Sequence, residues 1–525
     1  MEENKKKKKS KKKIIIVLLV LILVIGVGVG CYFLFFNKSE KSIKANKKEV
    51  KSEYEMTGND LSEFDLAFLK LENQGKNKVY SPLSIKYALE MLSEGSNGNT
   101  KEQIDAIIGK YEAKKYTNSR NMSFANALFV RDTFAKTINK EYASKLKTKY
   151  NAEVVEDSFA TANNINKWVK NKTLGLIDSL YDDVSDYNFV LANALAIDMN
   201  WVKNIQADTN HTSDEYSVNF AHEKYSDYVP VIDEDSYGTI QFNNKTIKAR
   251  GVEFAATLNN YDIVGDLGEE NIRKTVGEEY KAWLSKKQCG DDYDYEDVDT
   301  YLNHYIKELD EGYKTEKVST DFYEYHDDNV KVFAKDLKEY NGTTLQYVGI
   351  MPVKEELSSY IQKVKAKDLS SIISKLKEIK LENYAKGKIT NIKGSTPVFN
   401  YSDNLSLIAD LETLGMKDAF EEEKADLSKL TSAKNTFIAD ATHKATIEFS
   451  NEGIKAAAVT SIAGRGSTGC GFDHLYDVPV ETIDLTFENP YMYIIRDKSS
   501  GEVWFMGSVY TPTINQSTNG EILNK

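Results

Sequence analysis

The sequence predicts an α+β fold, because helical patterns dominate the first third of the chain and strand patterns dominate the last third. In the first third, the apolar residues Phe64, Phe68 and Leu71 recur at helical spacing and predict an amphipathic helix. Near the C-terminus, two apolar runs flank a turn at residues 498–501, and this pattern predicts a β-hairpin in the last third of the chain. The chain has 525 residues, of which 41% are hydrophobic, so it can form two or three average domains or one large domain with insertions.

The individual elements follow from apolar spacing and from the residues that start and stop helices. The predicted helices begin near Leu61, after Pro82, and at the capping-box pattern Thr100 to Gln103. The predicted strands are 189–199, 345–352, 491–496 and 503–510. The first two strands are nearly all apolar, which is typical of strands buried on both faces.

The N-terminus predicts a membrane anchor. Residues 1–13 contain eight lysines and two glutamates and form a basic segment, and the uninterrupted apolar run 14–36 follows. About 20 apolar residues span a bilayer as a helix, whereas a cleavable signal core has about 7–15. The lysines predict a cytoplasmic N-terminus, so 14–36 is interpreted as a single-pass signal-anchor in the cell membrane with the C-terminal domain extracellular. Lipoprotein processing at Cys31 is the alternative.

The charge and motifs of the remaining chain exclude several classes of function. The formal charge is −12, and removing the local +6 of the basic segment leaves −12 − 6 = −18. Such an acidic body argues against nucleic-acid binding. The sequence lacks a phosphate-binding loop, HExxH and CxxC, so we expect no cofactor and no metal. Whether Cys289 and Cys470 pair is left open.

Segments without clear periodicity flank and interrupt the predicted domain. Residues 37–56 are charged and are predicted to be a solvated stalk, and 515–525 form a C-terminal tail. An acidic insertion is expected at about 235–310. Its acidic run 291–297 fails the calcium-loop template, because, with Asp292 as the first position, Asp297 and Asn303 occupy the positions that require Gly and Glu. We therefore expect a solvated acidic insertion of unknown role.

The most informative segment is 443–467. Its residues Ile454, Ala456, Ala458, Thr460 and Ile462 share one face at the strand period of two, and none is charged. The segment nevertheless leads into 464–469, a Gly-rich stretch that predicts an exposed loop. A loop with the side chains of a buried strand could leave the surface and enter a sheet.

Two catalytic interpretations of this region are weaker than structural ones. The run 464–469 matches G-x-G-x-x-G, but Pro479 and alternating apolar residues follow instead of a helix, so no dinucleotide site is expected. His443 lies in a strand pattern, which favours a structural histidine over a general base.

Several motifs in this segment resemble sequence motifs of the serpin family. That family carries an HKA segment, a hinge glycine and an alanine-rich run before its reactive loop, and this chain has 443–445, Gly453 and 456–458. Further similar motifs occur in family order across 57–514: 81–84, 88–92, 126–129, 165–169, 175–177, Asn193–Ala194, Trp201, 411–416, 489–491, 495–497 and 505–507. The match is poor between about 205 and 330.

The resemblance implies a serpin domain at 57–514, with about three sheets, a large central sheet A, eight or nine helices and an exposed reactive loop. It implies a monomeric inhibitor, not an enzyme, that acts as a suicide substrate of a serine protease, or of a cysteine protease. The cut loop would insert into the largest sheet. A non-inhibitory surface binding or adhesion protein on the same fold is the alternative.

The resemblance also assigns roles to individual residues. The hinge is Gly453, Ile454, Ala456, Ala457 and Ala458, and the shutter and breach residues are Ser81, Ser84, Asn193, His443 and Trp201. His443 is expected to be hydrogen-bonded near Asn193 and the two serines. The span from Gly453 to Pro490 is about a dozen residues longer than expected, so the reactive bond is assigned as Ser467–Thr468, with Arg465–Gly466 as the alternative.

Overall fold

The computed structural model describes residues 59–202, 216–220, 223–225, 238–243, 247–286, 297–312, 321–450, 453–454, 472, 474 and 478–512. The predicted anchor, the basic segment, the stalk, the tail, the hinge alanines 456–458 and the reactive-bond residues 465–468 lie outside these ranges. In the described part, no helix combines the length and the apolar character needed to cross a bilayer. The account below concerns the unit of residues 54–411 and 415–525.

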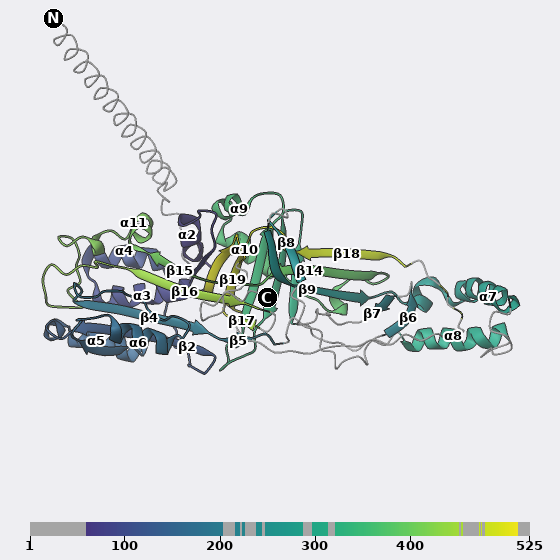
Figure 1. Ribbon diagram of the computed structural model, residues 1–525, viewed down its shortest axis with the longest axis horizontal. Coiled ribbons are helices and arrows are strands. Elements are labelled where there is room, and N and C mark those ends of the chain that lie inside the picture. Colours follow the sequence, from purple (N-terminus) through teal and green to yellow (C-terminus); the bar gives the residue numbers. More distant parts are fainter. Residues whose placement is uncertain are drawn as a thin grey trace, which may run out of the picture. The chain divides into compact units, whose positions relative to one another are not determined.

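The described residues form ten α-helices, and eight of them lie outside the predicted insertion. The helices are α2 (Glu63–Leu71), α3 (Pro82–Gly95), α4 (Gly98–Ile108), α5 (Lys140–Tyr150), α6 (Asn163–Lys172), α7 (Glu269–Ser285), α8 (Val298–Gly312), α9 (Leu357–Lys363), α10 (Ala366–Ser374) and α11 (Ile408–Leu414). Together with the sheets, they confirm the predicted α+β class (Figure 1).

The largest sheet has seven antiparallel strands. Their order is β1 (Lys78–Tyr80), β20 (Val503–Val509), β19 (Tyr491–Asp497), β12 (Leu345–Pro352), β11 (Val330–Asp336), β10 (Phe322–His326) and β13 (Lys377–Glu378). The predicted C-terminal hairpin is β19–β20, and every residue of β12 is buried, as its apolar run predicted. At Gly507 a Cβ would lie 2.1 Å from the Lys78 carbonyl oxygen, so the β1–β20 contact requires glycine.

The remaining strands form smaller sheets. A four-stranded sheet has the order β18 (Val480–Thr486), β14 (Ile389–Pro397), β9 (Ile247–Asn259) and β8 (Gly238–Phe242). The others are β3 (Glu153–Asp157) with β2 (Met122–Arg131) and β4 (Phe189–Ile197), β15 (Phe399–Ser406) with β16 (Thr442–Phe449), β17 (Gly453–Ile454) with β5 (Met199–Asn200), and β6 (Tyr216–Phe220) with β7 (Glu223–Tyr225).

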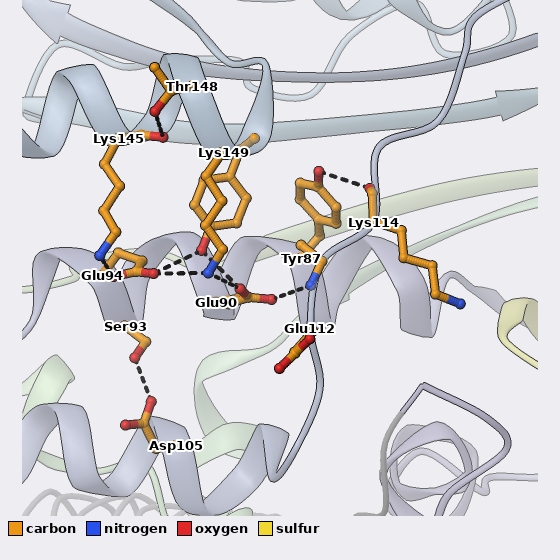
Figure 2. A network of polar contacts seen from close by, with 12 residues as sticks. Tyr87, Glu90, Ser93, Glu94, Asp105, Glu112, Lys114, Lys145, Thr148 and Lys149 are labelled. Carbon is orange, nitrogen blue, oxygen red and sulfur yellow. Dashed lines mark hydrogen bonds and ion pairs between the residues drawn. The ribbon is translucent and has the colours of Figure 1, made fainter.

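Helix α3 is fixed against α5 by charged side chains (Figure 2). Lys149 Nζ lies 2.6 Å from Glu90 Oε1 and 3.0 Å from Glu94 Oε1, and Lys145 also bonds Glu94. Burial would raise the pKa of Glu94, but the bonds from the two lysines outweigh it and lower this pKa. The C-terminal half of α3 is therefore fixed against α5.

The predicted capping box at the start of α4 is wrong. The helix begins at Gly98, two residues before Thr100. The Thr100 hydroxyl accepts from the Asp426 amide at 2.9 Å, and Gln103 accepts from the Lys417 and Asp418 amides. Both side chains thus bind a distant segment instead of their own helix end.

The acidic run 291–296 lies outside the described residues, and the part of the insertion that the structure describes contains two helices on either side of it. Helices α7 and α8 pack against each other, and Gly277 lets them approach so closely that a Cβ there would lie 3.1 Å from Leu302. Their apolar core consists of Tyr261, Ile263, Ile272, Val276, Leu302, Ile306 and Ile389. The helical hairpin is therefore anchored on β14 through Ile389.

Candidate functional site at the loop hinge and the strand slot

A slot separates β4 from β16. Among the described strands, β4 pairs with β2 and β16 pairs with β15, and no ladder joins the two pairs. A cavity of about 270 Å³ lies between them, lined by β4, β16 and α3. In Figure 1, β4 and β16 run next to each other on the side of the molecule that carries α3. Along this stretch the facing edges of β4 and β16 have no strand partner among the described residues.

The two faces of β4 meet different partners. Val190, Ala192 and Ala194 belong to the core cluster that contains the apolar residues of α6. Alternation places Leu191, Asn193 and Leu195 on the other face. That face is turned toward α3, because Phe124, which pairs with Leu195, contacts the ring of Tyr87 on α3 at 4.7 Å.

The hinge lies at one end of the slot. Gly453 pairs with Asn200 and Ile454 pairs with Met199, and the two strands are antiparallel. Because β5 continues β4 after a single residue, the chain direction of β17 points along β4 into the slot. Gly453 and Ile454, which follow β16 in the chain, thus already lie on the path that an inserted strand would take.

Trp201 fixes the hinge end of the slot. Its indole is fully buried, and Nε1–H donates to the Ser450 carbonyl oxygen at 3.1 Å. The ring contacts Phe449 edge-on at 5.6 Å, and the backbone forms a bridge with Leu337. One side chain therefore ties the end of β5 to the end of β16, immediately before Gly453.

His443 borders the cavity and bonds the start of α3. The Ser81 amide donates to His443 Nε2 at 2.9 Å, and the Ser84 amide donates to the Ser81 hydroxyl at 3.1 Å. Burial lowers the pKa of His443 to about 4, although the ring retains some accessible surface because it lines the cavity. The imidazole is therefore neutral at pH 7, with Nε2 as acceptor.

Asn193 lines the same cavity but bonds elsewhere. Its amide donates to Asn126 Oδ1 at 2.6 Å, and Asn126 donates to the Tyr150 carbonyl oxygen at 3.1 Å. The structure thus brings Ser81, Ser84 and His443 together on one side of the slot and holds Asn193 on the other. All four residues line the one cavity, and the Asn193 amide bonds Asn126 and not His443.

Tyr401 on β15 is a residue that sequence reasoning missed. Its hydroxyl lies 2.9 Å from the Tyr493 hydroxyl, 2.9 Å from the Ser508 carbonyl oxygen and 3.2 Å from the Lys78 carbonyl oxygen. The β15–β16 pair is thereby tied to the seven-stranded sheet. The strand alternation of 399–406 was the one local signal that the Tyr401 side chain points inward. No local pattern in the sequence predicts which residues it contacts.

One sequence expectation about this region is modified. The hinge lies at the slot between β4 and β16, and not on the seven-stranded sheet, which is the largest one described. In the described residues, no group of three or more His, Cys, Asp or Glu side chains is placed to hold a metal ion.

Known proteins share this architecture. The family profile "Serpin (serine protease inhibitor)" matches residues 63–255 and 314–512. An uncharacterized serpin-like protein of Methanosarcina acetivorans is 23% identical over an alignment of 488 residues, which covers 88% of this chain and 87% of that protein. Human leukocyte elastase inhibitor is 25% identical over 470 residues, covering 85% of this chain and 97% of its own.

Solved structures agree in fold. The thermophilic serpin tengpin in its native state has a TM-score of 0.54 at 20% identity, covering 85% of this chain and 92% of its own. Human thyroxine-binding globulin has a TM-score of 0.55 at 18% identity, covering 87% of this chain and 97% of its own. The gap in the family profile, 256–313, contains α7 and α8.

Proposed function

Because the chain belongs to the serpin family, a family of protease inhibitors and not of enzymes, we propose that it is a suicide inhibitor of a serine protease. The serine hydroxyl of the protease attacks the carbonyl carbon of the reactive bond. The C–N bond breaks, the new amine takes the proton, and an acyl-enzyme remains. The freed loop then enters the slot between β4 and β16. The observation that carries this proposal is the antiparallel pairing of β17 with β5 at the slot.

The observed register extends into a prediction for the inserted strand. Continuing from Ile454 opposite Met199 places Ala456 opposite Ile197, Ala458 opposite Leu195 and Thr460 opposite Asn193. Directly opposed residues share a face, so the uncharged residues of the loop would be turned toward α3.

Asn193 offers a partner for the inserted strand. Its Oδ1 atom is buried and accepts no hydrogen bond from the described residues. In the extended register Thr460 stands opposite, and its hydroxyl could donate to this oxygen. An otherwise unfilled acceptor at this position supports insertion with this register.

The free energy available is large enough for the mechanism. Ladder bonds contribute about 0.5–1.5 kcal/mol each, and burial adds roughly 25 cal/mol per Å² of apolar area. About ten residues lie between Ile454 and Gly464, which the register places opposite Phe189 at the far end of β4. Insertion therefore releases on the order of 10 kcal/mol, which is enough to distort a bound protease.

We assign the reactive bond to Ser467–Thr468, with Arg465–Gly466 as the alternative. Both follow Gly464, so cutting either one leaves the full length of β4 available for pairing. Ser467 fits a small or permissive specificity pocket, and Arg465 fits an acidic one. Incubation with one elastase-like and one trypsin-like protease, followed by mass measurement of the C-terminal fragment, identifies the bond.

The decisive experiment mixes the protein with a panel of serine proteases. Inhibition by this mechanism gives a complex that survives SDS and has the summed mass of both proteins. Ala456→Glu should abolish the complex and turn the protein into a substrate, because insertion would bury an unpaired charge. Ala456→Ser, small and uncharged at the same position, should still form the complex. Equal complex formation by the Glu variant would refute insertion.

A non-inhibitory binding protein is the second candidate. It is favoured by the α7–α8 hairpin, which the family profile does not cover, and by the similarity in fold to thyroxine-binding globulin, a binding protein by name. Clean loop cleavage by every protease, with full protease activity remaining, would support this candidate.

We further propose that the protein is a monomer displayed on the outside of a cell membrane. The basic segment followed by 23 residues without a charge, 14–36, supports an anchor with its N-terminus in the cytoplasm. Protease added to intact cells should remove the C-terminal domain, and the anchor should resist carbonate extraction. Recovery of the whole chain in the soluble fraction would contradict this.

A further inference from the structure

The α7–α8 hairpin contacts the chain that follows the predicted reactive bond. The ring centroid of Phe472 lies 5.2 Å from Tyr280, 5.9 Å from Trp283 and 5.9 Å from Tyr301. Such aromatic pairs add directional attraction to the burial of their surface. The chain is therefore attached to the hairpin at residue 472, before β18 begins at Val480.

This attachment limits how far the predicted reactive bond can lie from the hairpin. Four residue steps separate Thr468 from Phe472, and six separate Gly466 from it. Because one step spans at most about 3.6 Å, these two residues can lie no more than about 14 Å and about 22 Å from Phe472. Attachment at Val480 alone would allow Thr468 a distance of about 43 Å. The contact with the hairpin, and not the pairing of β18, therefore keeps either bond close to α7 and α8.

A protease that attacks either bond is large compared with these distances. A protease domain of roughly 230 residues is about 45 Å across. Helix α7 has 17 residues and α8 has 15, so they are about 25 Å and about 22 Å long. With the bond in its cleft, the protease therefore has the hairpin within reach of its rim, on the side where the C-terminal part of the loop leaves the cleft.

The hairpin also carries much of the negative charge of the protein. Residues 256–313, which the family profile does not cover, contain 15 acidic and 6 basic residues and so have a formal charge of −9. This is half of the −18 that follows the basic segment, in 58 of 512 residues. Within the described part of the chain, four exposed carboxylates of the two helices form no ion pair: Glu270, Glu278, Asp299 and Asp310. The charge alone identifies no partner, but the length of the loop places the protease beside it.

We propose that the α7–α8 hairpin is a second docking surface for the target protease, and that this protease has a basic surface beside its catalytic cleft. Opposite charges on facing surfaces raise the association rate and discriminate between partners. The loop then supplies the bond that is attacked, and the hairpin selects among proteases that can attack it. This inference rests on the proposed function and adds the chemistry by which the protease is chosen.

The test uses cationic and anionic trypsin, which both cut after Arg and Lys, because Arg465 is the one such residue in 456–471. The second-order rate at which each trypsin attacks the loop is measured at 0.15 M salt, where charges act over about 8 Å. The hairpin variant combines Glu270→Lys, Glu278→Lys, Asp299→Lys and Asp310→Lys. Relative to the wild type, it should react at least about fivefold more slowly with cationic trypsin and faster with anionic trypsin.

The matched control makes the same change in net charge at exposed glutamates outside the hairpin. It combines Glu102→Lys, Glu141→Lys, Glu156→Lys and Glu423→Lys. In Figure 1, α4 and α5, which carry the first two of these, lie at the opposite end of the molecule from α7 and α8. The control should react like the wild type with both trypsins, because these charges are screened over that distance.

The outcomes separate the two proposals. Opposite effects on the two trypsins support docking at the hairpin, since a misfolded variant would not change the two rates in opposite directions. If both trypsins cut the loop and no complex survives SDS, inhibition of trypsin-like proteases fails, while the cutting rates still measure docking. Equal rates for the hairpin variant and the wild type, or the same changes in the control, would overturn the docking surface whether or not complexes form. Failure of both trypsins to attack the loop would also overturn it.

Discussion

His443 predicts a pH dependence of stability that a single substitution should remove. The pKa of its side chain is about 4 in the folded protein, against about 6.5 for a free histidine. The unfolded chain therefore binds the proton more readily than the folded protein. The contribution of His443 to the free energy of unfolding is thus fully present above pH 6.5 and declines as the pH falls toward 4. For these two values, lowering the pH from 7 to 5 costs at most about 2 kcal/mol.

His443→Gln isolates this contribution, because the amide is neutral throughout and can still accept from the Ser81 amide. Unfolding in urea would be followed for both proteins at pH 7 and at pH 5. The carboxylates titrate in both proteins, so their effects cancel in the comparison. We expect the wild type to lose about 2 kcal/mol more than the variant on going to pH 5. An identical loss in both would show that His443 is not kept neutral by its surroundings.

Two further substitutions test the frame around the slot. Trp201→Phe removes the hydrogen bond to Ser450 and should lower the free energy of unfolding by about 1 kcal/mol and speed amide exchange at the hinge; unchanged exchange would contradict the role of Trp201 in fixing β17. Gly507→Ala places a Cβ 2.1 Å from the Lys78 carbonyl oxygen and should destabilise the fold by about 3 kcal/mol or more in thermal unfolding; a wild-type melting temperature would disprove this close contact.

The sequence allowed the elements whose signal is local to be predicted. The apolar runs of β4 and β12 and the hairpin β19–β20 carry their own periodicity and turn residues, and the structure has them within one or two residues. The uncharged face after Gly453 was also visible as a period of two. Family motifs then suggested a breach role for Trp201 and a shutter role for His443, and both roles stay predictions.

Features that depend on contacts between distant residues could not be predicted. The side chains of Thr100 and Gln103 are common in capping boxes, but backbone amides more than 300 positions away take their bonds. The spacing of Ile272, Val276 and Tyr280 could have revealed α7, yet the acidic residues around it dominated the pattern. Nothing in the sequence indicated that Phe472 would pack against the apolar core of the α7–α8 hairpin.

The attachment of Tyr401 determines which half of the slot can move. Because its hydroxyl hydrogen-bonds the Ser508 and Lys78 carbonyl oxygens, the β15–β16 ribbon is tied to the seven-stranded sheet. Widening the slot to admit a new strand must then displace β4, together with β2, β3 and the α6 that covers them. We expect the slot to open by movement of β4 and its neighbours, while β15 and β16 stay in place.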